Sequence, residues 1–324
     1  MRHYLVTGGL GFLGSALVRR LVKQGNAVRI LDDASRGSTR RLSGLLPSIE
    51  LIQGDIRDPD HVSRAVNGVD SVCHLAFING TRYFYEQPAD VLEVGVKGML
   101  NVLDACRKHR VEELVLASSS EVYQTPPAFP ADEEVPLVIP DLHNPRYSYA
   151  AGKIISEVLA VHYGAGFLKR VLIFRPHNVF GPDMGWEHVI PELTLRILKL
   201  KTEAGSSVPT LTLQGDGQQS RSFIYIDDFI EGLLTVLEHG EHLNVYHIGT
   251  SEEIRIRQVA EAIARCLDVQ VRVAGGQPAQ GGVTRRVPNI EKLHKLGFQP
   301  RTPFQEGLRR TVEWYAAQPA MAAR

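Results

Sequence analysis

A tyrosine and a lysine, Tyr149 and Lys153, stand four residues apart in the stretch 146–157. This stretch predicts the first turns of a helix, and residues four apart on a helix project from the same face. A nearby ammonium shifts the pKa of a phenol, ordinarily about 10, by roughly 1–3 units towards the phenolate. The pair therefore predicts a general base, although the same spacing also occurs on solvated helices. Tyr147 is no equivalent, because Ala151, four residues after it, carries no charge.

A glycine-rich turn near the N-terminus predicts a dinucleotide site. A β-type run over residues 2–7 leads directly into Gly8-Gly-Leu-Gly-Phe-Leu-Gly14, and an apolar helical pattern follows. The turn fits the G-x-G-x-x-G fingerprint from Gly9 and its G-x-x-G-x-x-G variant from Gly8. Such glycines let the backbone approach a pyrophosphate, and the helix N-terminus offers N–H groups and a positive dipole end. The alternative is an ordinary glycine turn between a strand and a helix.

Acidic residues after the second strand-like run favour the dinucleotide interpretation. The run over residues 27–31 ends in Asp32 and Asp33, and an acidic residue about 20 positions after the glycines accepts hydrogen bonds from the adenosine ribose. A carboxylate there also repels the 2′-phosphate of NADP, whereas Arg36 could hold that phosphate. The sequence therefore favours NAD and leaves NADP open.

Composition sets the broad class. The 324 residues carry 36 basic and 36 acidic side chains, and this length suggests about two domains. The balanced charge recommends neither a nucleic-acid nor a membrane partner. No apolar run is long enough to span a bilayer, and the opening strand leaves no room for a signal peptide, so we expect a cytoplasmic protein. Cys73, Cys106 and Cys266 are far apart and are expected to be buried apolar residues, with no disulfide and no metal site.

The order of the elements predicts the fold class. Strand-like runs alternate with helical patterns up to Phe174, which indicates a doubly wound parallel sheet with helices on both faces. Beyond Pro176 the pattern changes to helices mixed with short strands. We expect an α/β chain with a Rossmann-type NAD-binding domain over residues 1–176, which includes the Ser, Tyr and Lys. A smaller mixed α/β substrate domain is expected over residues 177–324, with the chain free to cross between the two.

Several further motifs occur with these in a characteristic order. They are Thr7–Gly14, Asp32, Gly54-Asp55, His74-Leu-Ala76, Ser118–Tyr123, Tyr149-x-x-x-Lys153, Arg175–Pro182, Gly215–Gln218, Arg221–Asp227 and Tyr246–Gly249. Together they resemble the extended short-chain dehydrogenase/reductase family, in its nucleotide-sugar epimerase/dehydratase branch, which includes UDP-glucose 4-epimerase. The resemblance runs from Arg2 to about Tyr315, nearly the whole chain.

The resemblance implies a cofactor site and a reaction that begins with a transient oxidation. Tyr149 would take a proton from a sugar hydroxyl, usually O4, while Lys153 would lower the pKa of Tyr149 and hold the nicotinamide ribose. Ser119 would hydrogen-bond the same sugar oxygen, although Ser118 and Ser120 are equally available from the sequence. The implied NAD-binding residues are Gly8, Gly11, Phe12, Leu13, Gly14, Asp32, Asp33, Asp55, Ile56, Leu75, Ala76, Tyr149, Lys153 and Pro176.

The fate of the 4-keto sugar decides which reaction follows. In 4-epimerases of this family the intermediate rotates and is reduced on its other face. In 4,6-dehydratases and decarboxylases, an acidic residue two before the strand-end tyrosine acts next, and Glu121 stands at that position before Tyr123. We favour C4 epimerisation, because it demands the fewest extra groups. The alternatives are dehydration or decarboxylation through Glu121, an NAD(P)-dependent reductase of a free small molecule, and a catalytically silent NAD-sensing relative.

The resemblance also implies a nucleotide-diphosphate sugar as the substrate and a homodimer formed through two helices of each subunit. Residues expected to contact the substrate are Ser119, Asn178, Val189, Arg221 and Arg286, with the arginines on phosphates. Arg285 is nearly as good a candidate as Arg286. One departure from the family is Gly95, which stands where many relatives carry an asparagine close to the site.

Overall fold

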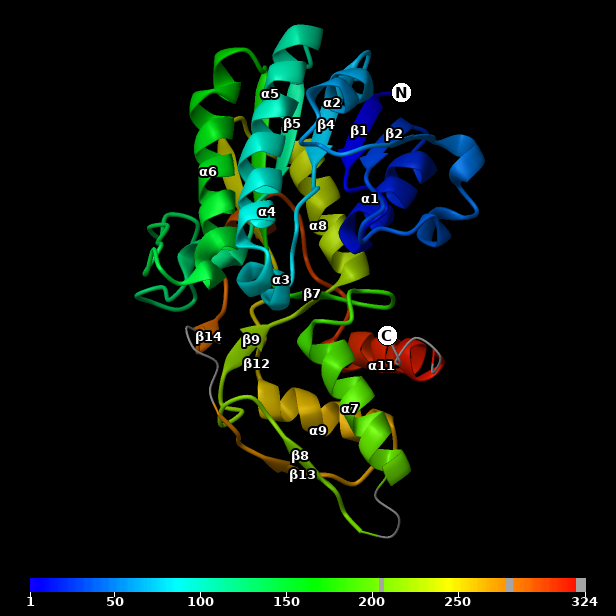
Figure 1. Ribbon diagram of the computed structural model, residues 1–324, viewed down its shortest axis with the longest axis vertical. Helices are drawn as coiled ribbons and strands as arrows, with labels where there is room; N and C mark the ends of the chain where they lie inside the picture. The colour runs from blue at the N-terminus through cyan, green and yellow to red at the C-terminus, as the bar shows by residue number, and fades with distance from the viewer. Residues whose placement is uncertain (204–206, 278–281, 319–324) are drawn as a thin grey trace.

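A computed structural model of the chain describes residues 1–203, 207–277 and 282–318. Figure 1 shows a layered upper part, in which helices flank a sheet, and a lower part built around helices α7 (Val189–Glu203), α9 (Ile256–Cys266) and α11 (Phe304–Ala316). Strands β7 (Val179–Phe180) and β10 (Ile224–Tyr225) pair with each other near the junction of the two parts.

The upper part contains a seven-stranded sheet in the order β11-β6-β5-β4-β1-β2-β3. All neighbouring strands pair in parallel, which confirms the predicted Rossmann-type sheet. Strand β11 was not expected, and it lies beyond residue 176, so the chain returns to the sheet after leaving it. The strands are β1 (His3–Thr7), β2 (Ala27–Asp32), β3 (Glu50–Gln53), β4 (Ser71–His74), β5 (Glu113–Ala117), β6 (Arg170–Pro176) and β11 (Asn244–Ile248).

Both faces of this sheet are covered because successive strand residues point to opposite sides. In β1, Leu5 belongs to one buried apolar cluster, while Val6 belongs to another. The Leu5 side packs under α2 (Pro59–Val66), α5 (Gly98–His109) and α6 (Ser148–His162), and the Val6 side packs under α1 (Phe12–Lys23) and α8 (Ile226–His239). Each fully buried Leu or Val contributes about 1.5–3 kcal/mol.

The long helical segment between β4 and β5 is continuous but not uniform. It begins as α4 (Pro88–Leu92), widens into a π-helical turn over Glu93–Lys97, and continues as α5. π-helical turns are rare and occur frequently at functional sites. Just before it, the aromatic-rich segment after β4 contains a short helix, α3 (Thr81–Glu86).

The lower part follows the expected order of helices with several small strand pairs. Strands β9 and β10 are separate, because Phe223 lies between them. The remaining elements are β8 (Thr210–Thr212), β9 (Ser220–Ser222), β12 (Glu253–Arg255), β13 (Arg272–Ala274), β14 (Arg285–Arg286), α10 (Glu291–His294) and 3-10 turns at Thr39–Leu42, Leu46–Ser48, Ser120–Tyr123, Pro145–Tyr147 and Gly164–Gly166.

Two expectations from composition can be compared with the fold. Cys73 and Cys106 are buried, but Cys266 is exposed at the end of α9, so the prediction of burial was wrong for that residue. Within the three described stretches, no helix combines the length and the apolar character needed to cross a bilayer.

A buried ion pair ties helix α6 to the sheet. Glu157 of α6 accepts hydrogen bonds from Arg175 of β6 on both carboxylate oxygens, at 2.9 Å from Nε and 2.6 Å from Nη2. The Ser118 hydroxyl, at the end of β5, also donates to Glu157, and the Arg175 guanidinium donates to the Tyr123 hydroxyl. Because both charges are buried and saturated with partners, the pair fixes the helix that carries Tyr149 against two strand ends.

Candidate active site at the carboxyl ends of the strands

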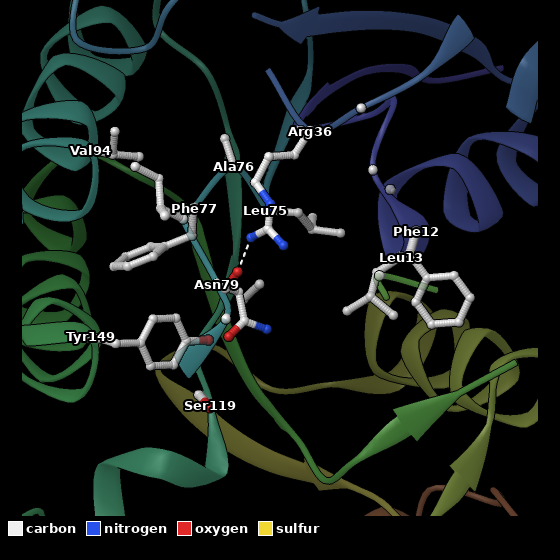
Figure 2. A pocket seen from close by; sticks show the side chains of 18 of the residues that line it. Phe12, Leu13, Arg36, Leu75, Ala76, Phe77, Asn79, Val94, Ser119 and Tyr149 are labelled. Carbon is white, nitrogen blue, oxygen red and sulfur yellow. Dashed lines mark hydrogen bonds between the residues drawn. The ribbon is translucent and has the colours of Figure 1, made fainter. Parts of the chain in front are cut away.

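A cavity of about 420 Å³ opens where the strands of the parallel sheet end. Ligands of doubly wound folds bind at this edge, and a volume of this order suits a small-molecule site. Gly8 after β1, Asp32 at the end of β2, Ala76 after β4 and Ser119 after β5 all line it. Figure 2 shows Phe12 and Leu13 on one side of this space and Tyr149 on the other. Every residue predicted for the site lines the cavity except Val189 and Arg221.

The glycine turn forms a cradle that side chains would fill. Gly8 has φ +71°, and a Cβ there would lie 2.9 Å from the backbone nitrogen and Cα of Ala76. A Cβ on Gly14 would lie 2.1 Å from the Gly8 carbonyl oxygen. Glycine is therefore required at both positions, and the turn leaves the N-terminus of α1 open towards the cavity. These residues fit the pyrophosphate of a dinucleotide.

Asp32 is buried at the adjoining strand end. Its carboxylate accepts hydrogen bonds from the backbone N–H groups of Leu10 and Ala34, both at 2.9 Å. Burial raises the pKa of Asp32, and these two N–H groups partly offset the effect. The carboxylate thus lies where a ribose hydroxyl would donate to it.

The Arg36 guanidinium is engaged by other residues and is not held in readiness for a 2′-phosphate. It donates to the Asn79 carbonyl, pairs with Glu187 at 3.1 Å and lies 4.7 Å from the ring centroid of Tyr83. Figure 2 shows the side chain reaching across to Asn79. These contacts occupy the group that would hold the 2′-phosphate of NADP, so the structure favours NAD.

Tyr149 and Lys153 lie side by side on the first turns of α6, as their spacing predicted. Both are buried, and both line the cavity. The Lys153 ammonium donates to the carbonyl of Ala117 at 2.6 Å. The Tyr149 ring stacks on Phe84 with centroids 4.8 Å apart and meets the edge of Phe77 at 5.1 Å.

Burial shifts the ionisation of both residues towards their neutral forms. It raises the pKa of Tyr149 to about 12, against the opposing effect of a hydrogen bond with Ser119. It also lowers the pKa of Lys153 to about 7, although Glu157 acts in the other direction. The expected lowering of the Tyr149 pKa by Lys153 is therefore not found in this structure. The physical reason is desolvation, which outweighs a cation that is directed at the Ala117 carbonyl.

Glu121 and Arg286 form an ion pair in the cavity wall, with Oε1 and Nη1 2.8 Å apart. Burial by itself would raise the pKa of Glu121, but Arg286 with Arg146 and Arg221 holds it below the ordinary value. Arg286 is buried, and its Nε and Nη2 have no hydrogen-bond partner among the described residues. The geometry thus leaves N–H groups of one guanidinium available to an anionic ligand.

The two predicted residues outside the cavity lie just behind its wall. Arg221 pairs with Arg286 across strands β9 and β14, but its guanidinium donates to the carbonyls of Ser220 and Val283, both at 2.7 Å. Burial and the charge of Arg286 lower the pKa of Arg221 to about 9. Val189 is the first residue of α7.

The structure separates the candidate serines. All three serines, Ser118, Ser119 and Ser120, line the cavity. Ser118 donates to Glu157, as described above, whereas Ser119 lies near the Tyr149 hydroxyl (Figure 2) and is hydrogen-bonded to it. The Ser119 oxygen accepts the N–H of Glu121 at 3.1 Å, which caps the 3-10 turn after β5. Asn178 also lines the cavity and donates from Nδ2 to the Ser222 carbonyl at 2.8 Å.

Comparison with known proteins identifies the family. The sequence model of the NAD dependent epimerase/dehydratase family matches residues 4–249. A UDP-N-acetyl-alpha-D-glucosaminuronate decarboxylase from Bacillus cytotoxicus is 30% identical over 97% of this chain and 98% of its own length.

The chain belongs to the NAD-dependent epimerase/dehydratase family. Solved structures agree. The UDP-glucose 4-epimerase of Thermus thermophilus in complex with NAD superposes with a TM-score of 0.85 at 29% identity, covering 98% of this chain and 99% of that chain. A double mutant of dTDP-glucose 4,6-dehydratase from Streptomyces venezuelae with NAD bound gives 0.88 at 29% identity, covering 99% and 98%. The predicted fold class, family and cofactor are confirmed.

Sequence reasoning missed part of the site of this epimerase/dehydratase family member. Phe77 and Phe84 pack on Tyr149, and Glu187 and His188 line the cavity from the segment before α7. Phe77 directly follows His74-Leu-Ala76, so its place after a strand end was available as a signal. Glu187 carries no comparable signal, since only the fold brings it to Arg36. Among the described residues, no three His, Cys, Asp or Glu side chains gather as a metal site would require.

The glycine cradle makes a direct prediction about cofactor binding. Gly14→Ala places a methyl group against the Gly8 carbonyl, so we expect at least a tenfold loss of NAD affinity by calorimetry. Gly44→Ala is the matched control, because no heavy atom lies within 4 Å of its Cβ position, and it should bind NAD like the unaltered protein. Circular dichroism of both variants checks the fold. Unchanged NAD affinity in a folded Gly14→Ala protein would contradict the assignment of the cradle.

Proposed function

We propose that this protein modifies a nucleotide-diphosphate sugar through a transient 4-keto intermediate, with C4 epimerisation as the favoured outcome. The observation that carries the proposal is the convergence of Tyr149, Lys153 and Ser119 on one wall of a cavity whose other end is the dinucleotide cradle. Relatives named as an epimerase, a dehydratase and a decarboxylase all share the fold or sequence over nearly the whole chain. In this proposal, residues 1–176 bind the cofactor and most of residues 177–324 bind the substrate.

The chain's own residues supply proton transfer and positioning. NAD, held by the glycine cradle and Asp32, would supply hydride transfer from the sugar carbon that is oxidised and back to it. Ser119 orients the sugar hydroxyl, and Tyr149 removes its proton and later gives the proton back. Because the pKa of Tyr149 is about 12 in this structure, the phenolate needs positive charge nearby in the loaded site. The ammonium of Lys153, four residues along the same helix, provides part of that charge.

The diphosphate of the substrate is assigned to Arg286, with Arg221 behind it and Asn178 beside it. Arg286 is buried and carries N–H groups with no partner within the described stretches. Phosphate oxygens satisfy such groups in the forked geometry that a guanidinium offers. Val189, at the start of α7, is retained as a proposed contact of the substrate.

Glu121 is the residue on which the alternative reactions depend. In a dehydratase or a decarboxylase it would act on the 4-keto sugar. Its ion pair with Arg286 and its lowered pKa keep it ionised and weaken it as a base, which suits a structural partner of Arg286 better than a group that donates or accepts a proton. This observation favours epimerisation. Dehydration or decarboxylation remains the alternative, and an NAD(P)-dependent reductase of a free small molecule is the second.

A panel of UDP-, dTDP-, GDP- and CDP-sugars, with products followed by NMR, tests the proposal. Inversion at C4 is expected, while loss of water or CO₂ would assign the Glu121 chemistry instead. Stoichiometric consumption of added NADH by a free ketone would favour the reductase and contradict the proposed function.

Removal of the phenol oxygen tests the assigned base. Tyr149→Phe should lower kcat by at least about 100-fold, the usual contribution of general acid–base catalysis, and should leave NAD binding nearly intact. Tyr147→Phe is the matched control, because Tyr147 stands two residues earlier and does not line the cavity. Steady-state kinetics on the substrate found in the panel measures both. Turnover of Tyr149→Phe equal to that of Tyr147→Phe would rule out Tyr149 as the base.

Substitution of Glu121 separates the reactions. If the protein is an epimerase, Glu121→Gln should retain turnover within about tenfold, since the carboxylate takes no proton in that reaction. If Glu121 is the acid or base of a dehydratase or a decarboxylase, turnover should fall by about 100-fold or more. The measurement is kcat for the variant, with NAD affinity as the check that the site is intact.

We also propose a homodimer that buries the outer face of α4, α5 and α6. Large apolar side chains are exposed along this face: Leu92, Leu100, Ile155 and Val158. Helices α4 and α6 contact each other, so this face can pack on a second copy of the chain.

A cytoplasmic location stays a prediction.

Sedimentation velocity of the full chain tests the dimer. The unaltered protein should sediment as a dimer, and Val158→Glu, which places a charge on the proposed interface, should shift it towards the monomer. Val208→Glu is the control, since Val208 is equally exposed but precedes β8 in the lower part. A monomeric unaltered protein at micromolar concentration, or equal behaviour of the two variants, would contradict the proposed interface.

A further inference from the structure

The aromatic ring of Phe77 lies against the catalytic pair. Phe77 follows the end of β4 by three residues, and Lys153 Nζ is 4.0 Å from the centroid of its ring. The edge contact with Tyr149, at 5.1 Å and 81°, places the same ring beside the phenol. Figure 2 shows Phe77 and Tyr149 next to each other, with Val94 beyond Phe77.

The ring sits in a slot made by two glycines on two different helices. A Cβ on Gly95, in the π-helical turn, would lie 2.4 Å from Phe77 Cζ, and a Cβ on Gly152, in α6, would lie 3.0 Å from the same atom. The Ser156 hydroxyl lies 3.2 Å from the Gly95 carbonyl and ties the two helices together at this level. A larger residue at position 95 would push the tip of the ring out of the slot.

The other charged and titratable groups around Lys153 do little to stabilise its ammonium. Tyr149 and Glu157 face it from its own helix, and Glu157 is engaged by Arg175 and Ser118. His74 faces it from β4, where burial holds the pKa of His74 at about 3 and leaves it neutral.

A buried ammonium needs compensation for lost hydration. Among the described residues, the Ala117 carbonyl accepts its hydrogen bond, and the Phe77 ring lies nearer to the charge than the Tyr149 ring, with centroids at 4.0 and 5.8 Å. A cation over an aromatic face is attracted by the ring quadrupole, and the attraction grows when the pair is desolvated.

We propose that Phe77 is a positioning residue: the face of its ring holds Lys153 as an ammonium beside Tyr149, and Gly95 and Gly152 provide the slot that the ring requires. The inference deepens the proposed function, because Lys153 must be charged to favour the Tyr149 phenolate. Simple core packing would need neither the centred approach of the ammonium nor two glycines facing one ring.

The positive charge of the Lys153 ammonium determines the direction in which its pKa moves when the Phe77 ring is removed. Loss of the ring destabilises the ammonium and lowers the pKa of Lys153, so a smaller fraction is charged at neutral pH. Activity that depends on the ammonium is present below this pKa and is lost as pH rises through it. In the Phe77→Leu protein this loss should therefore occur at lower pH.

The test measures Lys153 in the full chain without substrate. The Cε resonance of Lys153 in ¹³C-lysine-labelled protein, assigned by its absence in Lys153→Met, is titrated with pH. In Phe77→Leu the titration midpoint should fall by about one pH unit, the size expected for a desolvated cation–π contact. Phe84→Leu is the first control. It removes the ring that stacks on Tyr149 but leaves Phe77 in place, and the midpoint should not move.

A matched pair of glycine variants tests the slot. Gly95→Ala should displace the ring and lower the Lys153 midpoint as Phe77→Leu does, and the double variant should show no further fall. Gly98→Ala, one turn later, creates an equally close contact, because its Cβ would lie 2.4 Å from Ile56 Cδ1. It should leave the Lys153 midpoint unchanged, since it does not touch Phe77.

Two outcomes would overturn the inference: an unchanged midpoint in Phe77→Leu, or equal changes in Gly95→Ala and Gly98→Ala. The pH profile of kcat then connects the titration to turnover, and its alkaline limb should move to lower pH in Phe77→Leu and Gly95→Ala but not in Phe84→Leu or Gly98→Ala. Because the titration needs no substrate, its failure is distinct from failure of the proposed function, which appears in the sugar panel.

Discussion

The buried pair between Glu157 and Arg175 is the interaction on which the site depends. Two hydrogen bonds between saturated, desolvated charges fix α6 against β6, and Ser118 fixes the same carboxylate to the end of β5. Removal of one partner from such a pair typically costs about 3–5 kcal/mol. The helix that carries Tyr149 is therefore held in register with the strand ends, where the parallel sheet also presents the glycine turn and Asp32.

Desolvation then determines how the site is charged. Burial moves the pKa of Tyr149 up to about 12 and that of Lys153 down to about 7, so both groups are pushed towards neutrality. Glu121 is kept ionised only because guanidinium groups surround it. A site arranged in this way becomes competent when ligands bring charge into it, which couples the chemistry to binding. The low-dielectric wall that opposes the phenolate also strengthens the electrostatic interactions of each charged ligand group that binds.

The sequence was sufficient where the signal was local. The first turns of α6 follow from the pattern over residues 146–157, and the glycine cradle follows from its spacing after β1. Strand β11 was missed because its place depends on pairing with β6, about 70 residues away. The direction of the Tyr149 pKa shift was also missed, since burial is a property of the packed cavity. The sequence places Phe77 after a strand end, but only the fold brings Gly95 and Gly152 around its ring.

The most direct test of the account follows a deuterium atom placed on C4 of a nucleotide sugar that the protein converts. If Tyr149 acts on one carbinol while the oxidised carbon stays in the closed site, NMR should find the label retained on the same carbon of the product, without exchange with water. An inverted C4 centre that has lost its label to solvent, or a product changed at another carbon while C4 keeps its original configuration, would contradict the central claim.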